Sequence, residues 1–433
     1  MKVLMFGWEF PPHISGGLGT ACYGLTKGLS HVKDIDITFV IPKAFGDEEQ
    51  VLARVIGANN VMLSDQYINY EGFLREIKLV EIDSKLVPYQ DPEEYEKISN
   101  SRENGSKTLI NTVLRGKIDF QGGYGGGLWQ EISNYAIVAG EIAKKYAHDV
   151  IHAHDWLTFP AGIAAKNVSG KPLVVHVHAT EFDRSGGSVN PGVYEIEKKG
   201  LEAADKIITV SNLTRDTVVY KYGIPAEKVT TIYNAVEPYI SKEAENYKKS
   251  INEKIVTFLG RITMQKGPEY FIEAANLVLR KMHNARFVMA GSGDMFQKMI
   301  RRAAQLKITD RFHFTGFLKG DDVYKMFAIS DVYVMPSVSE PFGISPLEAM
   351  QSSVPVIISY QSGVSEILKY AIKVNFWDVE AMADAIYGVL NYNALPDIFK
   401  KYGKAEVENL KWENSARKVK EVYDSVVKPK ITL

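Results

Sequence analysis

The fold is decided by a stretch that reads IVTFLGRITMQKGP from Ile255 to Pro268. The apolar, β-branched run Ile255–Leu259 predicts a buried strand. Gly260 then opens a loop, and Pro268 suits the first turn of a helix because its fixed φ is already helical. A strand, a short loop and a helix form the unit of parallel α/β sheets, so the stretch predicts an α/β fold.

The same unit recurs along the whole chain, because short β-branched runs alternate with longer amphipathic segments. In the first half, strands are predicted at Val3–Phe6, Ile37–Ile41, Val150–His154, Leu173–His178, Lys206–Val210 and Val229–Ile232. In the second half, they are predicted at Ile255–Leu259, Arg286–Ala290, Phe312–Thr315, Val332–Met335 and Val354–Ile358. We therefore expect two Rossmann-like, doubly wound domains that face each other across a ligand-binding cleft.

The expected domain boundaries follow from length and composition. A chain of 433 residues suits two domains of roughly 200 residues each. We place the first domain at 1–236, a polar linker rich in Lys and Glu at 237–254, and the second domain at 255–410. An amphipathic helix at Trp412–Val426, within 411–433, should cross back to the first domain. Residues 84–127 are expected to form a long irregular insertion.

Composition excludes several classes of protein. The 51 Lys and Arg against 52 Asp and Glu give a net charge of -1, which disfavours a nucleic-acid binder. Cys22 is the only cysteine, so an internal disulfide and a multi-cysteine metal site are excluded, as in a reducing cytoplasm. No run of about 20 apolar residues is present, so no membrane span is predicted. We expect a cytoplasmic protein.

Two cations stand in the loop after the strand Ile255–Leu259. Arg261 and Lys266 are five residues apart at the carboxyl end of that strand. A guanidinium binds oxygens bidentately and an ammonium adds a point charge, which together suit a diphosphate. Taken alone, the pair could equally be two solvated surface cations.

Two carboxylates follow the strand Val332–Met335 in the sequence EPFGISPLE, from Glu340 to Glu348. Glu340 is expected in a loop, and Glu348 about one turn inside the helix that begins near Pro346. Both carboxylates could accept hydrogen bonds from sugar hydroxyls, and the backbone N–H groups of Gly343 and Ile344 should face the same cleft. A first-turn carboxylate is also favoured by the helix dipole alone, which would explain Glu348 but not Glu340.

A glycine pair follows the first predicted strand. Gly16 and Gly17 precede a helix, so backbone N–H groups there could approach an anionic ligand. The loop lacks the dinucleotide-binding pattern because Cys22 stands where a third glycine is needed. A dehydrogenase is therefore not supported.

Paired histidines occur on two predicted strands. His152 and His154 alternate on one strand, and His176 and His178 repeat the pattern on the next. His-x-His pairs could bind a metal, but no cysteine or compact ligand set accompanies them in the sequence, so we expect no metal. His154 and His178 should reach the cleft, while the other two are interpreted as core histidines with satisfied hydrogen bonds.

Together these motifs resemble the retaining glycosyltransferases of the GT-B fold, in particular family 4 and the glycogen and starch synthases of family 5. The likeness covers nearly the whole chain, and the spacing of Glu340 and Glu348 is its most specific part. Two departures stand out. Ile14 replaces a lysine common in bacterial glycogen synthases, and Ser362 interrupts a usual Thr-Gly-Gly.

The resemblance implies a role for each matched residue. Arg261 and Lys266 would stabilise the departing diphosphate, Glu340 would bind hydroxyls of the transferred sugar, and Glu348 would bind the ribose. Gly16 and Gly17 would close over the phosphates. His154 would contact the donor hexose near the reacting carbon. Cations would take the place of a divalent metal, and no cofactor is implied.

The leading hypothesis is an α-glucan synthase that uses ADP-glucose or UDP-glucose as donor. The first alternative is a family 4 enzyme acting on a lipid-linked, exopolysaccharide or small-sugar acceptor. A hypothesis of another class is a non-catalytic sensor of nucleotide sugars. A sensor need not keep both cations and both carboxylates, which disfavours it.

Overall fold

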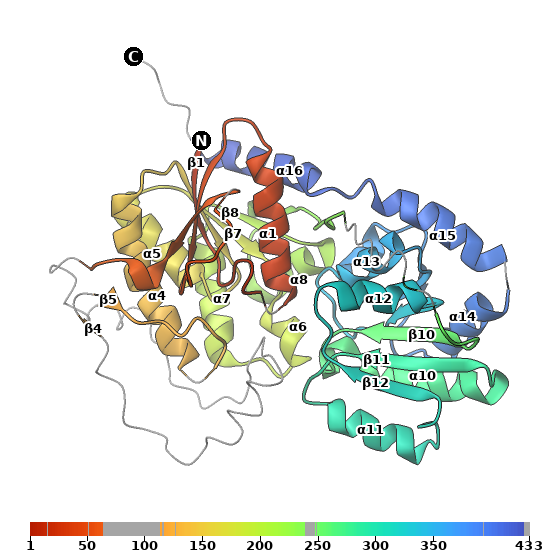
Figure 1. The fold of residues 1–433 in the computed structure, drawn as a ribbon. Helices are drawn as coiled ribbons and strands as arrows, with labels where there is room; N and C mark the ends of the chain where they lie inside the picture. Colours follow the sequence, from red (N-terminus) through yellow and green to blue (C-terminus); the bar gives the residue numbers. More distant parts are fainter. Residues whose placement is uncertain are drawn as a thin grey trace, which may run out of the picture.

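The chain folds into two lobes, each built on a parallel sheet (Figure 1). The structure is a computed structural model that describes residues 1–14, 16–50, 52–63, 113–114, 117–125, 127–238, 247, 249–392 and 394–427. The larger part of the predicted insertion, 84–112, lies outside the described residues, as do 239–246 of the predicted linker.

The first lobe holds a seven-stranded sheet in the order β3-β2-β1-β6-β7-β8-β9. Its strands are β1 (Lys2–Phe6), β2 (Asp36–Ile41), β3 (Arg54–Gly57), β6 (Val150–His154), β7 (Leu173–Val177), β8 (Lys206–Thr209) and β9 (Val229–Thr231). The helices are α1 (Gly17–Ser30), α4 (Leu128–Lys145), α5 (Phe159–Ser169), α6 (Glu181–Ser185), α7 (Pro191–Ala203) and α8 (Asn212–Tyr222). A separate antiparallel pair is formed by β4 (Val113–Leu114) and β5 (Lys117–Ile118).

The second lobe holds a six-stranded sheet in the order β12-β11-β10-β13-β14-β15. Its strands are β10 (Lys254–Leu259), β11 (Ala285–Ala290), β12 (Phe312–Gly316), β13 (Val332–Met335), β14 (Val356–Ser359) and β15 (Ile372–Val374). The helices are α10 (Pro268–Lys281), α11 (Phe296–Gln305), α12 (Asp321–Ile329), α13 (Ser345–Gln351), α14 (Val379–Asn391) and α15 (Ala394–Val407). Short 3-10 turns include η4 (Met264–Lys266) and η5 (Gly363–Glu366).

Every predicted strand is present, and the prediction of two doubly wound parallel-sheet domains is confirmed. Among the strands that were not predicted are β3, β15 and the antiparallel pair of β4 and β5. The strands β3 and β15 are short and stand at the edge of their sheet, where one strand neighbour is absent and the apolar pattern is weaker.

Each sheet has one point at which the strand order reverses. In the first sheet β1 lies beside β6, and in the second β10 lies beside β13. The chain winds outward in opposite directions from these pairs, so the loops at their carboxyl ends diverge and leave a crevice. The loops after β1, β6, β10 and β13 are therefore the ones expected to line a ligand site.

The last helix, α16 (Trp412–Val426), leaves the second lobe and packs on the first, beside α1 (Figure 1). Trp412 is buried against two glycines of α1. A Cβ on Gly24 would lie 2.3 Å from the indole, and one on Gly28 would lie 2.6 Å from the Trp412 carbonyl oxygen. Small residues on α1 therefore let the two helices approach closely. The helix shares its hydrophobic core with β1 and α1, through side chains such as Tyr423.

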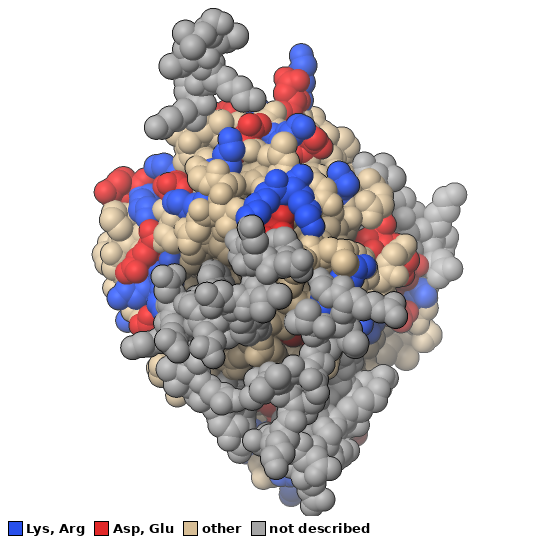
Figure 2. All heavy atoms as spheres, turned by 90° about the vertical axis from the view of Figure 1, so that its left-hand side faces the viewer, with Lys and Arg blue, Asp and Glu red and all other residues tan. Residues whose placement is uncertain are grey.

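The surface carries both signs of charge. On the face drawn in Figure 2, basic and acidic side chains are intermixed over the part that is not grey, as the near-zero net charge leads one to expect. Within the described part of the chain, no helix combines the length and apolarity that crossing a bilayer requires.

Replacing Trp412 with Ala should destabilise the protein by about 3–5 kcal/mol, because it leaves a cavity between α16 and α1. Urea unfolding followed by circular dichroism measures this loss. The matched control is Trp377→Ala, since the Trp377 side chain is 56% exposed and its removal should change stability by about 0.5 kcal/mol or less. Equal losses in the two variants would show that α16 contributes little to the first lobe.

Candidate active site

Two loops meet at the point where the strand order of the second sheet reverses. Lys266 lies at the end of η4, in the loop after β10, and Glu340 lies in the loop after β13. The Lys266 Nζ and Glu340 Oε2 atoms are 2.5 Å apart, and the Ser337 hydroxyl donates a hydrogen bond to the same carboxylate oxygen at 3.2 Å. Glu340 is only 7% exposed. A charge-assisted bond of this kind fixes both side chains at the mouth of the crevice.

A glycine makes this close approach possible. Gly267 has a φ of +67°, and a Cβ there would lie 2.0 Å from the carbonyl oxygen of Pro336. The Val338 N–H also donates to the carbonyl oxygen of Gln265 at 2.9 Å, which joins the two loops through their backbones. Lys266 is therefore positioned by its loop as well as by its ion pair.

A small cavity of about 90 Å³ opens between these loops. It is lined by Phe258, Leu259, Gly260, Lys266, Tyr333, Met335, Ser337, Glu340 and Ser345. Arg261 follows directly after Gly260, and its Nη2 atom donates to Gln265 Oε1 at 3.1 Å. A larger hollow of about 430 Å³ lies along α15 and contains none of the predicted site residues.

The segment after Glu340 contacts both lobes. Gly343 has a φ of +100°, and Ile344, at the start of α13, packs against the hydrophobic cores of both lobes. Glu348 lies in the first turn of α13 and is half-buried. Burial raises the pKa of Glu348 to about 7, so this carboxyl group is partly protonated near neutral pH.

In the first lobe, Gly16 caps α1 and Gly17 begins it. A Cβ on Gly17 would meet no described atom within 4 Å. By contrast, a Cβ on Gly19 would lie 2.7 Å from a carboxylate oxygen of Glu9. Internal packing thus accounts for a glycine at position 19 but not at position 17.

The opposite wall of the crevice is α6, which the sequence analysis did not identify. The Ser339 hydroxyl, next to Glu340, donates to Asp183 Oδ1 across the lobes at 2.6 Å. A Cβ on Gly186 would lie 2.0 Å from the terminal methyl of Met264, so α6 also touches η4. Arg184 of α6 forms ion pairs with two buried carboxylates, Glu181 in the same helix and Glu197 in α7. No sequence pattern links residues 183 and 339, because the contact joins separate domains.

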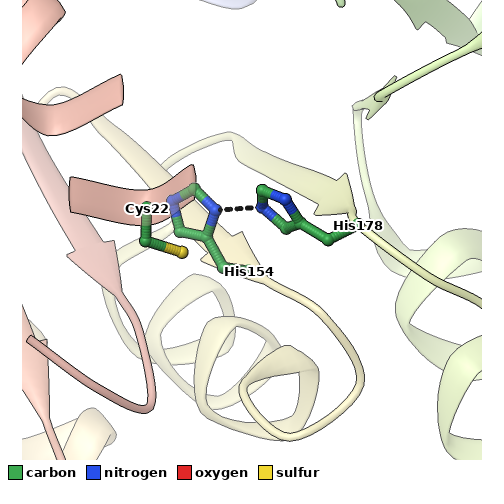
Figure 3. A group of neighbouring side chains, drawn as sticks. All are labelled: Cys22, His154 and His178. Atoms are coloured by element: carbon green, nitrogen blue, oxygen red, sulfur yellow. Dashed lines mark hydrogen bonds between the residues drawn. The ribbon is translucent and has the colours of Figure 1, made fainter. Parts of the chain in front are cut away.

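His154 and His178 lie deeper in the first lobe than the sequence predicts. His154 and His178, expected at the cleft, are 0% and 9% exposed. Their strands β6 and β7 lie in the middle of the sheet, and the histidines project from the face that α1 covers (Figure 3). Burial lowers the pKa of His178, as it does that of His152, to about 3, so both rings are neutral at pH 7.

Two further expectations about the histidines are wrong. His176 was interpreted as satisfied, but neither of its ring nitrogens has a hydrogen-bond partner among the described residues. A cysteine does accompany the cluster, because α1 places Cys22 beside His154 (Figure 3). More than a hundred residues of sequence separate these two side chains, which is why no local motif reveals the group.

Comparisons with known proteins agree with this architecture. Residues 112–239 match the family model "Glycosyltransferase Family 4", and residues 240–406 match "Glycosyl transferases group 1". An uncharacterized glycosyltransferase of Methanocaldococcus jannaschii is 30% identical over 98% of both chains. A glycogen synthase of Mycobacterium tuberculosis is 24% identical over 98% of this chain and 94% of its own. The solved sucrose-phosphate synthase of Thermosynechococcus elongatus superposes with a TM-score of 0.71 at 17% identity, covering 98% of each chain.

Glu348→Gln should flatten the dependence of stability on pH. The folded protein binds the Glu348 proton more tightly than the unfolded chain, whose carboxyl has a pKa near 4.5. The contribution of protonated Glu348 to the free energy of unfolding is therefore complete below about pH 4.5 and is lost as the pH rises through 7. The loss is about 3 kcal/mol at most. Urea unfolding at pH 5 and pH 8 should show a smaller decline in Glu348→Gln than in the wild type. The exposed Glu421→Gln serves as control, and parallel declines in all three proteins would contradict the prediction.

Proposed function

Because the chain belongs to the glycosyltransferases, with family 4 and group 1 domains on a GT-B fold, we propose that it moves glucose from a nucleotide-diphosphate sugar to an α-glucan. ADP-glucose or UDP-glucose is the proposed donor. The anomeric configuration is retained, and no divalent metal acts on the diphosphate. The reaction takes place in the cytoplasm.

The observation that carries this proposal is the Lys266–Glu340 pair at the reversal point of the second sheet. A departing diphosphate gains negative charge as the bond to the sugar breaks. Fixed cations stabilise such charge most effectively when they need not reorganise during the reaction. Lys266 meets this condition because Glu340 and the Gly267 turn hold it, and Arg261 in the same loop adds a second cation.

The remaining donor contacts are proposed from the type of each residue and from its position relative to the crevice. Glu340 accepts hydrogen bonds from hydroxyls of the transferred sugar, and Glu348 from those of the ribose, while Gly343 and Ile344 offer backbone N–H groups. Gly16 and Gly17 approach the phosphates from the first lobe, and the open space at Gly17 supports this assignment. Because the rings of His154 and His178 are buried beneath α1, the proposed donor contacts do not include them.

A glucan acceptor is favoured over a lipid-linked one by one comparison. The glycogen synthase relative matches the chain over nearly its whole length, so its likeness includes the first lobe, where the acceptor is expected to bind. A lipid-linked or small-sugar acceptor is the alternative, and nucleoside diphosphate release measured with and without glycogen separates it from a glucan acceptor.

Lys266→Ala should lower kcat by about 10²–10³-fold, with a smaller effect on KM, because its charge matters most when the diphosphate departs. Steady-state assays of nucleoside diphosphate release measure both constants. The matched control is Lys298→Ala, since Lys298 also lies 2.5 Å from a glutamate, Glu269, but is well exposed in the same lobe. A near-normal kcat in Lys266→Ala would show that the charge of Lys266 does not stabilise the departing diphosphate.

The proposed reaction is tested by incubating the protein with ADP-glucose or UDP-glucose, with and without glycogen. We expect nucleoside diphosphate release that glycogen stimulates, and an α linkage in the product by proton NMR. Excess EDTA should leave the rate unchanged, and added Mg²⁺ or Mn²⁺ should not raise it. Release of nucleoside diphosphate without transfer of glucose to glycogen would overturn the proposed acceptor. A β linkage in the product would overturn retention of the anomeric configuration. A loss of activity on chelation that Mg²⁺ or Mn²⁺ restores would overturn the metal-free step.

A further inference from the structure

A cluster of four buried histidines lies in the first lobe, outside the proposed donor contacts. His152 and His154 project from β6. His176 projects from the neighbouring β7, and His178 comes directly after the end of that strand. The register pairs His154 with His176, and neighbouring rings lie close, with centroids 4.2 Å apart for His152 and His154 and 4.4 Å apart for His176 and His178. All four side chains are at most 9% exposed.

The cluster contains more polar atoms than its hydrogen bonds use. His152 Nδ1 pairs with the Tyr423 hydroxyl at 2.6 Å, and His154 Nδ1 pairs with His178 Nε2 at 2.9 Å. Among the described residues, no partner is found for His152 Nε2, His154 Nε2, His178 Nδ1 or either ring nitrogen of His176. Buried ring nitrogens without partners cost free energy, so a group that binds them would stabilise this part of the fold.

A thiol completes a possible ligand set. Cys22, also buried, extends from α1 toward His154, whose ring lies between Cys22 and His178 (Figure 3). One ligand atom from each of these three side chains lies within 4.8 Å of the other two. One sulfur and two imidazole nitrogens are the ligand types that zinc and similar late transition metals prefer.

We propose that Cys22, His154 and His178 bind one divalent transition-metal ion of the zinc class. On binding, the Cys22 thiol releases its proton to solvent and the thiolate donates to the ion. The hydrogen bond between His154 and His178 is replaced by metal–nitrogen bonds. His178, which at 9% is the most exposed of the four histidines, marks the entry path.

The proposed ion joins α1 to β6 and β7. Cys22 lies on α1, so the ion would link this helix to the sheet. This role is structural and does not place the ion on the diphosphate. The inference therefore goes beyond the proposed function and does not depend on the donor or the acceptor.

A second set, His152, His154 and His176, also has ligand atoms within 4.8 Å of one another. The set with Cys22 is favoured because a thiolate adds a negative charge to the buried ion's surroundings, and because Tyr423 already engages His152. The two sets predict different behaviour for variants at Cys22, which makes the choice testable.

The test is elemental analysis of the untagged protein after dialysis against zinc and then against metal-free buffer. We expect about one zinc ion per wild-type chain and less than about a tenth in Cys22→Ser and His178→Gln. His148→Gln is the control, because His148 is a mostly buried histidine of the same lobe whose hydrogen bonds are to the Tyr146 carbonyl and Ser169, outside the cluster. A wild type without zinc, or variants at Cys22 and His178 that keep it, would overturn the proposal.

Cobalt substitution gives a readout that needs no variant. Because Cys22 is the only cysteine, a thiolate-to-cobalt charge-transfer band in the wild-type spectrum would report on this residue alone. We expect that band in the Co²⁺ protein, and its absence would contradict a thiolate ligand even if the variants failed to fold. Neither measurement requires turnover, so failure of the metal site and failure of the proposed glycosyl transfer remain distinguishable.

Discussion

The structure depends on one topological constraint, the reversal of strand order between β10 and β13. Loops that are some 70 residues apart in sequence leave the sheet side by side there, so Lys266 and Glu340 meet although neither is near the other along the chain. A parallel sheet can offer such a meeting point only at its carboxyl edge, where successive connections diverge. Because position 267 is a glycine, no side chain there collides with the carbonyl oxygen of Pro336, which would lie 2.0 Å from a Cβ.

The two lobes touch through η5 and through the loop after β13, which carries Glu340. Glu366 accepts hydrogen bonds from the backbone N–H groups of Asn212 and Leu213, at the start of α8, and Ser339 reaches Asp183 on α6. A Cβ on Gly363 would lie 2.4 Å from the Cβ of Ser211. Carboxylates bound to helix N-termini are favoured by the exposed N–H groups and the helix dipole, so these contacts fix the angle between the lobes at the crevice.

The architecture could be predicted from the sequence because each βα unit is indicated by residues that are neighbours along the chain. Ile255–Pro268 predicts strand, loop and helix from neighbouring residues alone, and the same holds for the other central strands. Contacts between units are different. The pairing of Asp183 with Ser339 and the grouping of Cys22 with His154 depend on how α6 and α1 pack, which no periodicity encodes. His176 illustrates the limit well, since its place on a strand was evident while the lack of partners for its ring was not.

Helix α1 is where these long-range contacts converge. On one side, Gly24 and Gly28 admit Trp412 of α16, whose chain has returned from the second lobe. On another, Cys22 faces the histidines of β6 and β7. The helix begins at Gly17, so it joins the glycine loop to both of these contacts. Helix α16 and the histidine cluster thus pack on the same helix that leads from the glycine loop.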